Sequence, residues 1–315
     1  MYIENNQLKK YISFWLATMF WLIAIMIVVG GLTRLTDSGL SITSWELLSG
    51  IIPPTSDSDW IKYFNLYKKI PEFQLQNYHM SLDEFKIIFW WEWLHRFLGR
   101  MVGISFLLPL IYFTFKLEFK IIRSFYLTFF LICFQGFIGW YMVSSGLIDR
   151  VDVSHYRLSL HLLIAFIILT LILWNYLMIN IKQTSQDKIK YNLPLIFLLL
   201  IYMQIIIGAF VSGMDAGKIY NSWPLMGNNY FPDDNVFFDL FKISVFDSPS
   251  LVQFIHRNLA YVILLFFLIM LFEVYKNKLT NLYLGIILIG FLLILQIILG
   301  ILTLLYGAQI FISSM

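Results

Sequence analysis

Long apolar segments alternate with shorter polar segments along the whole chain. Uninterrupted apolar runs of about 20 residues have the length that crosses a lipid bilayer as an α-helix. The pattern predicts seven such helices, at residues 13–34, 87–115, 123–144, 157–180, 193–213, 251–274 and 281–306. The expected fold class is therefore an all-α polytopic membrane protein, with long polar loops at residues 35–86 and 214–250.

The composition agrees with this fold class and narrows the chemistry. Of the 315 residues, 59% are hydrophobic and 13% are charged, and the mean hydropathy is +0.76. These values exclude an ordinary soluble domain. The single cysteine, Cys133, lies in an apolar run, which excludes a disulfide within the chain and a cysteine-rich metal site.

Charged residues separate to the two sides of the predicted helices. Basic residues dominate the segments on the side of the N-terminus, namely Lys9, Lys10, Lys116, Lys120, Arg123, Lys182, Lys188, Lys190, Lys276 and Lys278. The segments on the opposite side are rich in Asp. The positive-inside rule then places the N-terminus in the cytoplasm or in the mitochondrial matrix. We expect a multi-pass protein of the bacterial inner membrane or of the mitochondrial inner membrane.

The second half of the chain repeats the first. Matches at an offset of 178 residues are Gly30 with Gly208, Asp37 with Asp215, Gly39 with Gly217, and Ser44–Trp45 with Ser222–Trp223. Matches at an offset of 161 residues are His95–Arg96 with His256–Arg257, Gln135 with Gln296, and Gly139 with Gly300. An even number of helices separates corresponding segments, so the repeats are parallel. We expect two domains, residues 1–185 and 186–315, each based on a bundle of four helices.

The same duplication predicts one more helix. His161 lies in the fourth predicted helix, and its counterpart would fall 161 residues later, beyond Met315. We therefore expect an eighth helix with a fourth histidine, and a second bundle that is incomplete within these 315 residues.

Three histidines lie inside predicted membrane helices. His95, His161 and His256 are each followed four positions later by a small residue, respectively Gly99, Ala165 and Ala260. Positions four apart share one helix face, so each imidazole has a flat gap beside it, as a planar macrocycle requires. This arrangement predicts axial ligands of heme iron in a helical bundle rather than a zinc site. The alternative is a histidine that is hydrogen-bonded between closely packed helices.

A carboxylate accompanies the first of these histidines. Glu92 and His95 are three residues apart, so both lie on one helix face. Glu92 is a candidate catalytic base, or a negative charge that stabilises a reacting carbon; the alternative is simple pairing with Arg96. Its counterpart in the second half is Gln253, which predicts one reacting site and one supporting site.

Several arginines and glycines near the outer boundary are candidate binding or turn residues. Arg96, Arg100 and Arg257 suit the carboxylates of heme propionates, although long cations at a membrane boundary also extend simply into water. In the repeated segments TDSGLS and MDAGKI, Gly39 and Gly217 suit left-handed turns and Asp37 and Asp215 can bond the local backbone. These segments are expected to shape a turn over each bundle; the alternative is a lid over the edge of a porphyrin.

Four segments together resemble the heme A synthase family: GGLTRLTDSGLSITSWELLSGIIPP, EFKIIFWWEWLHRFLGR, GAFVSGMDAGKIYNSWPLMG and FIHRNLAY. The resemblance implies that the first half receives heme O between His95 and His161, with Arg96, and that Glu92 is catalytic. It implies that the second half holds a heme b cofactor through His256 and Arg257, with one more histidine on the eighth helix. The implied reaction oxidises a porphyrin methyl group through a hydroxymethyl intermediate to the formyl group of heme A.

The resemblance also sets expectations for partners and limits. It implies a heme O synthase (a farnesyltransferase) as supplier and cytochrome c oxidase as recipient, is compatible with a homo-oligomer, and implies no nucleic acid. The first outer loop lacks the cysteine pair of some bacterial members, so the chain fits the cysteine-free branch. A chain ending at Met315 would supply one ligand to heme b, and weak heme b retention is then expected. The alternatives are an electron-transfer cytochrome b with paired histidines and a transporter with parallel repeats.

Overall fold

The computed structural model describes residues 5–46, 49–181 and 187–308. The chain divides into two compact units, Met1–Lys182 and Gln183–Met315, which are described separately below. The predicted domain boundary, between residues 185 and 186, lies outside the described residues.

All seven predicted membrane helices are confirmed as helices long and apolar enough to cross a membrane. They are α1 (Asn6–Leu35), α4 (Leu82–Thr114), α5 (Phe119–Asp149), α6 (His155–Asn180), α7 (Leu193–Gly213), α8 (Pro249–Lys276) and α9 (Tyr283–Leu305). Several begin before the apolar run because polar residues cap them. Ser81, for example, accepts a hydrogen bond from the backbone N–H of Glu84, whose side chain bonds back to Ser81, which is a capping box.

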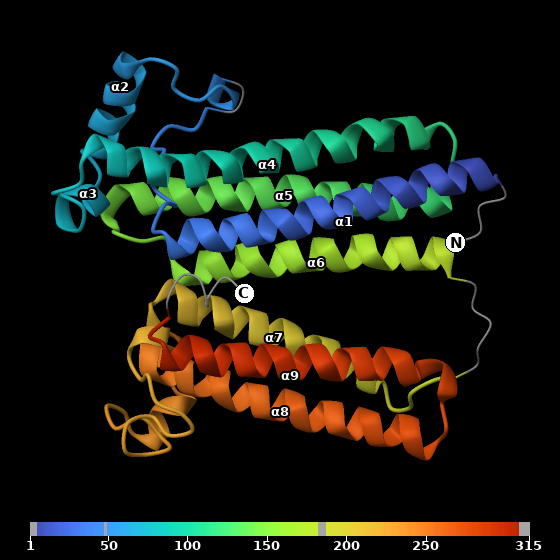
Figure 1. Ribbon diagram of the computed structural model, residues 1–315. Coiled ribbons are helices and arrows are strands. Elements are labelled where there is room, and N and C mark those ends of the chain that lie inside the picture. Colours follow the sequence, from blue (N-terminus) through green and yellow to red (C-terminus); the bar gives the residue numbers. More distant parts are fainter. Residues whose placement is uncertain (1–4, 47–48, 182–186, 309–315) are drawn as a thin grey trace. The chain divides into compact units, whose positions relative to one another are not determined.

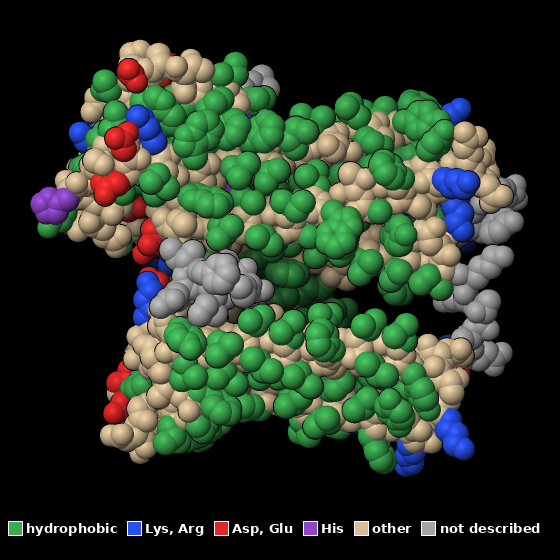
Figure 2. Space-filling model, viewed as in Figure 1, with side chains coloured by type: hydrophobic (Ala, Val, Ile, Leu, Met, Phe, Trp, Pro, Cys, Tyr) green, Lys and Arg blue, Asp and Glu red, His purple; other side chains and the backbone are tan. Residues whose placement is uncertain are grey.

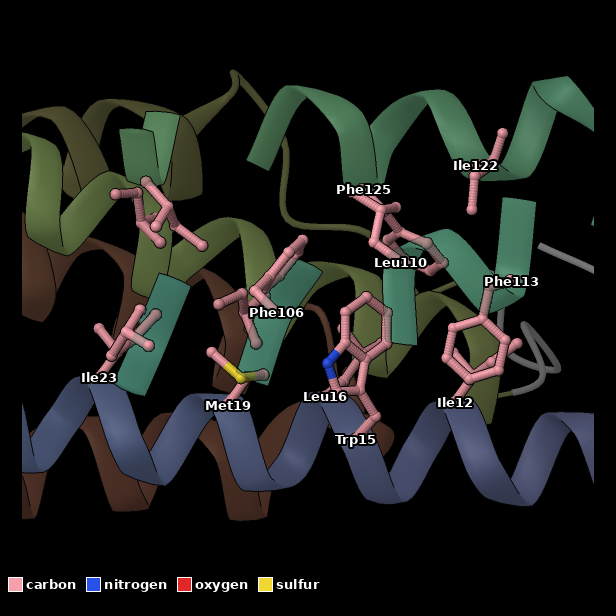
Figure 3. Close-up of a cluster of buried hydrophobic side chains, with 14 of the residues drawn as sticks. Ile12, Trp15, Leu16, Met19, Ile23, Phe106, Leu110, Phe113, Ile122 and Phe125 are labelled. Atoms are coloured by element: carbon pink, nitrogen blue, oxygen red, sulfur yellow. The ribbon is translucent and has the colours of Figure 1, made fainter. Parts of the chain in front are cut away.

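The first unit is a bundle of α1, α4, α5 and α6 (Figure 1). Helix α1 packs against α4 and α6, and α5 packs against the same two helices. Helix α4 continues through Pro109. Figure 3 shows the buried cluster in which α1 meets α4 and α5: Ile12, Trp15, Leu16, Met19, Ile23, Phe106, Leu110, Phe113, Ile122 and Phe125.

The first outer loop contains short helices that the hydropathy pattern does not reveal. Helix α2 (Asp57–Tyr67) and helix α3 (Pro71–Leu75) are separated from α1 by a single turn of 3-10 helix, η1 (Ser49–Ile51). An aromatic cluster fixes them to the start of α4, and its buried members include Trp60, Phe64, Tyr67, Phe85 and Phe89. The loop therefore forms a packed cap on the outer end of α4.

One buried carboxyl group in this cap makes the loop sensitive to pH. Glu72 is 3% exposed, and its Oε1 accepts a hydrogen bond of 3.2 Å from the Tyr67 hydroxyl. Burial raises the pKa of Glu72 from 4.5 to about 8, and repulsion by Glu92 and Asp152 acts in the same direction. The folded protein therefore binds this proton more tightly than the unfolded chain does.

We expect this proton to link the stability of the protein to pH. Glu72 contributes stability that is fully present below pH 4.5 and is lost as the pH rises through about 8. Glu72→Gln, which stays neutral, should flatten the dependence of the thermal unfolding midpoint on pH over this range. Parallel curves for the parent protein and Glu72→Gln would contradict the expectation.

The second unit contains α7, α8 and α9, with α8 packed against both other helices. Its buried core residues are Phe267, Met270, Val274 and Ile286. The loop between α7 and α8 contains three short turns of 3-10 helix, η2 (Ala216–Lys218), η3 (Phe237–Phe241) and η4 (Ile243–Asp247).

The surface of each unit, taken by itself, has an apolar middle and charged ends (Figure 2). In the first unit, acidic side chains gather at the end that carries α2 and α3, together with some basic ones, and basic side chains mark the opposite end. The second unit shows acidic groups at its outer-loop end and basic groups at the other. An apolar band between charged ends is the surface that a bilayer requires.

Candidate functional site

His95 and His161 face one another inside the first bundle. They come from α4 and α6, which lie on opposite corners of the four-helix arrangement. Their ring centroids are 6.5 Å apart and their planes differ by 64°. An imidazole nitrogen binds a first-row metal ion at about 2 Å, so two rings on opposite sides of one ion have centroids roughly 6 Å apart. The spacing therefore fits a pair of axial ligands that share one iron.

Each of these imidazoles lies against a glycine of a neighbouring helix. A Cβ atom on Gly30 of α1 would be 2.8 Å from Cε1 of His95, and one on Gly139 of α5 would be 3.0 Å from Cε1 of His161. The first distance is shorter than real Cβ contacts, and the second is tighter than nearly all of them, so a larger residue at either position would have to displace the imidazole. The ring position in the bundle thus depends on Gly30 and Gly139.

The small residues four positions after each histidine predicted a gap for the macrocycle on the histidine's own helix. The structure shows a different arrangement at His95. At Gly99, one turn below His95, a Cβ would lie 3.2 Å from Cε of Met26, so α1 fills that gap. At Gly103, one turn deeper, a Cβ would meet nothing within 4 Å. The sequence did contain a signal for the contacting glycines, because Gly30 and Gly139 both recur in the repeat.

The second unit contains a similar histidine. His256 of α8 lies against Gly208 of α7, where a Cβ would be 3.1 Å from its Cε1. Gly208 corresponds to Gly30 and His256 corresponds to His95 in the repeat. The same helix contact is therefore built twice, once in each unit.

The three membrane histidines share an unusual hydrogen-bonding state. The Nδ1 atoms of His95, His161 and His256 are buried, and none has a hydrogen-bond partner among the described residues. Each of the three residues as a whole is only partly buried. Buried polar atoms in proteins nearly always have partners, so the three Nδ1 atoms are unusual. The Nε2 of His256 does lie 3.3 Å from the Nε2 of Gln204 on α7, which is the contact between helices that the sequence left as an alternative, and the ligand role of the histidines stays a prediction.

Glu92 is buried, with 3% of its surface exposed, and it holds the start of the first outer loop. Its Oε2 accepts hydrogen bonds of 2.7 Å from the Ser41 hydroxyl and from the backbone N–H of Ile42. Its Oε1 accepts from Nε and Nη2 of Arg96, at 3.0 and 2.7 Å. The pairing with Arg96 that the sequence left as an alternative is therefore present, and the loop adds two further donors.

The arginine after each repeated histidine fastens the outer loop of its own unit. Arg96 donates to the carbonyl oxygens of Ile42 and Ser44, at 2.8 and 3.1 Å. Arg257 donates to the carbonyl oxygens of Tyr220 and Ser222, at 2.8 and 2.9 Å. Ile42 and Ser44 match Tyr220 and Ser222 at the offset of 178, so the repeat extends to individual hydrogen bonds.

These loop contacts bear on the expected binding of propionates. Arg96 divides its donors between the Glu92 carboxylate and the loop carbonyls, and Nη1 and Nη2 of Arg257 donate to loop carbonyls. Nη2 of Arg100 donates to the carbonyl oxygen of Glu46 at 2.7 Å. Beside them, a small open recess lies between the first outer loop and α4. Arg96, Arg100 and Trp93 line it. The carboxylate-binding role of the arginines stays a prediction, and this recess is the place where it would operate.

The left-handed turns of the repeated segments are formed by aspartates, and the expectation for the glycines is wrong. Asp37 has φ 48° and Asp215 has φ 51°, whereas Gly39 and Gly217 have no positive φ. Aspartate tolerates this conformation because its short polar side chain makes local bonds. Asp37 accepts a salt bridge of 2.6 Å from Arg34, which helps to fix the turn.

Comparison of the sequence with known proteins identifies its family. The family model described as cytochrome oxidase assembly protein matches residues 13–315. A protein named heme A synthase from Pelagibacter ubique is 50% identical, over 100% of this chain and 94% of the relative. Heme A synthases from Rickettsia bellii and Flavobacterium johnsoniae are 44% and 40% identical, over 98% and 96% of this chain and 94% and 91% of the relatives. The chain therefore belongs to the family of cytochrome oxidase assembly proteins that includes the heme A synthases.

Proposed function

We propose that this chain is a membrane-embedded oxidoreductase that converts heme O to heme A. The single observation that carries the proposal is the facing of His95 and His161, 6.5 Å apart inside a four-helix bundle. A tetrapyrrole whose iron lies between these rings is held from both faces. The porphyrin is the substrate, and the protein has to fix one of its methyl groups beside a reacting group.

His95 and His161 are the proposed axial ligands of the substrate heme in the first unit. Their positions follow from α4 and α6 and from the glycines that the rings contact. Arg96 is proposed to assist heme binding in two ways. It holds the first outer loop in place through hydrogen bonds to its carbonyl oxygens, and it lines the recess next to that loop. At each stage one C–H bond of the methyl carbon breaks: two electrons pass to an external oxidant, for which the test below supplies oxygen, and a proton passes to a base. The first stage also bonds an oxygen atom from a co-substrate, water or O2, to the carbon and gives the hydroxymethyl level, and the second stage gives the formyl level.

Glu92 is the proposed catalytic residue. Its carboxylate lies one helical turn from His95, and the hydroxyl of Ser41, the N–H of Ile42 and the guanidinium of Arg96 hold it in place. A fixed negative charge stabilises positive charge that develops on the methyl carbon, and a carboxylate can accept the departing proton. The second-unit counterpart, Gln253, donates from its Nε2 to the carbonyl oxygen of Tyr220 at 3.1 Å, and it cannot act as a base at neutral pH.

The second unit is the proposed site of a heme b cofactor. His256 would hold the iron of this heme, because its Nδ1 is buried without a partner in the described part of the chain and its ring rests on Gly208. Arg257 holds the loop beside it. Heme b supplies one-electron redox chemistry when bound, and Gln253 in place of a carboxylate fits a supporting rather than a reacting site.

The membrane placement follows from the charges. Basic residues at the end of each unit opposite the outer loops favour an N-terminus in the cytoplasm or the matrix. We propose the bacterial inner membrane as the location, because the named relatives are bacterial. A farnesyltransferase that makes heme O and the cytochrome c oxidase that receives heme A are the proposed partners in the pathway.

The proposal is tested by measuring which hemes the purified protein contains and converts. Purified protein, expressed with a supply of heme O, should contain heme O or heme A together with heme b after extraction and chromatography. Incubation with a reductant and oxygen should increase heme A at the expense of heme O. Retention of heme b with no conversion of heme O would favour an electron-transfer cytochrome, and a protein free of heme would contradict both.

A further inference from the structure

Two glutamines stand next to the membrane histidines without any role in the proposed reaction. The Nε2 of Gln135 on α5 donates to the backbone carbonyl oxygen of His161 on α6, at 2.9 Å. The Nε2 of Gln204 on α7 donates to the backbone carbonyl oxygen of His256 on α8, at 3.2 Å, and lies 3.3 Å from the Nε2 of its ring. In both cases a side-chain amide on one helix is hydrogen-bonded to the histidine of the following helix.

The glutamines are spaced from the contacting glycines in the same way. Gln135 comes four residues before Gly139, on which the ring of His161 rests, and Gln204 comes four residues before Gly208, on which the ring of His256 rests. Residues four apart lie on one helix face. On one face of the neighbouring helix, the glycine therefore contacts the imidazole ring, and the glutamine amide donates to the backbone carbonyl of the same histidine.

Both amides have an unused acceptor. The Oε1 atoms of Gln135 and Gln204 are buried, and neither has a hydrogen-bond partner within the part of the chain that the structure describes. A buried amide oxygen without a partner is costly, so a purely structural tie between helices does not explain the residue type. Histidines that bind a metal depend on polar neighbours to fix the direction of the ring.

His95 lacks this neighbour. The residue four before Gly30 is Met26, whose thioether contacts the helix of His95 near Gly99 and offers no amide. The two histidines that face one another in the first unit are thus held differently. One has both a glycine and a glutamine, and the other has a glycine alone.

We propose that Gln135 and Gln204 are positioning residues that fix His161 and His256 as heme ligands, and that Met26 leaves His95 as the more easily released ligand. This inference rests on the proposed function, since it requires that these histidines bind heme. A heme that enters as substrate and leaves as product has to exchange at least one ligand easily. The cofactor heme has no such need, which fits the presence of Gln204 at His256.

The test compares variants of the full-length protein loaded with both hemes. Gln135→Met gives His161 the neighbour that His95 has, and Met26→Gln gives His95 the neighbour that His161 has. Two properties are measured: the rate at which each heme transfers to excess apomyoglobin, followed by extraction, and the g-values of the ferric low-spin heme by electron paramagnetic resonance. The g-values report ligand orientation, which a general loss of packing does not shift in a defined way.

The expected results differ between the two hemes. Gln135→Met should release the first-unit heme about 10 to 100 times faster, as loss of a polar neighbour of a ligand typically does, with shifted g-values and unchanged release of heme b. Gln204→Met should do the reverse, and Met26→Gln should slow release of the first-unit heme. Thr128→Val is the matched control, because Thr128 is buried on the same helix as Gln135 and its hydroxyl, among the residues that the structure describes, bonds to the carbonyl oxygen of Ser124 in that helix.

The inference is overturned if Gln135→Met and Gln204→Met release their hemes at the parental rate with parental g-values. Should Gln135→Met fail to fold, Gln135→Glu decides in its place, because it keeps the size of the side chain and replaces the donor with an oxygen. A parent protein that binds heme while these variants behave like it contradicts only this inference. A parent protein that binds no heme overturns the proposed function as well.

Discussion

Replacing Glu92 with Gln is expected to lower the conversion of heme O to heme A by at least about 100-fold, the contribution typical of a positioned acid or base. Gln keeps the size of Glu and can still accept from Ser41 and Ile42. It loses the negative charge next to His95 and can no longer take up a proton. The heme composition of the purified variant is the measurement, with heme O accumulating and heme A absent.

The structure separates this effect from a general loss of folding. Glu92→Ala removes the partner of the buried Arg96 guanidinium, and breaking a buried ion pair in this way costs about 3–5 kcal/mol, so that variant should also loosen the outer loop. Glu72→Gln serves as the control, because Glu72 is an equally buried carboxyl of the same loop that bonds to Tyr67. Normal conversion by Glu92→Gln, with heme O bound, would show that Glu92 only fastens the loop and is not the catalytic residue.

A methyl group added at Gly30 is expected to displace the imidazole of His95. The Cβ of Gly30→Ala would lie 2.8 Å from Cε1 of the ring, and overpacking of this kind costs about 1–3 kcal/mol. Because about 1.4 kcal/mol corresponds to a factor of ten, we expect about 5- to 140-fold weaker retention of the first-unit heme. The measurement is the heme content after dilution and gel filtration, together with the visible absorption spectrum.

The adjacent residue is the control for this experiment. A Cβ on Gly31 would meet nothing within 4 Å, so Gly31→Ala makes the same change in helix propensity without touching the ring. Gly139→Ala and Gly136→Ala form a second pair, since only the first would crowd His161. Equal heme retention by Gly30→Ala and Gly31→Ala would show that the imidazole does not need the position seen in the structure.

The local sequence determined the membrane helices and the family of this protein. Each spanning helix needs a run of apolar residues in a fixed length range, and this condition acts on neighbouring residues only. The seven predicted helices are therefore confirmed, and the family resemblance, which rests on contiguous motifs, is confirmed by relatives up to 50% identical. Helix ends were less well predicted, because the helices extend into polar capping residues such as Asn5 and Ser81.

The short helices of the first outer loop escaped the sequence analysis for a different reason. Helix α2 carries acidic residues in its first turn and buries an aromatic face against the start of α4, so its stability comes from contacts with Phe85 and Phe89. A scan for apolar runs does not detect such a helix. The turn at Asp37 was also misassigned, because a glycine two residues later looked like the better candidate for a left-handed conformation.

The sequence by itself indicated three histidines as candidate heme ligands, a nearby carboxylate as a candidate catalytic group, and a parallel repeat. Residue type and spacing along a helix are sufficient for these predictions. The family resemblance already paired His95 with His161, and Glu92 with Arg96 was an alternative from spacing. The tertiary structure added that the two histidine rings face one another across the bundle, that each rests on a glycine of another helix, and that Glu92 and Arg96 together fasten the outer loop. These contacts join residues that are far apart in the sequence and depend on how α1, α4, α5 and α6 are rotated about their axes. Helix rotation is set by side-chain packing between helices, and the periodicity of a single helix does not contain it.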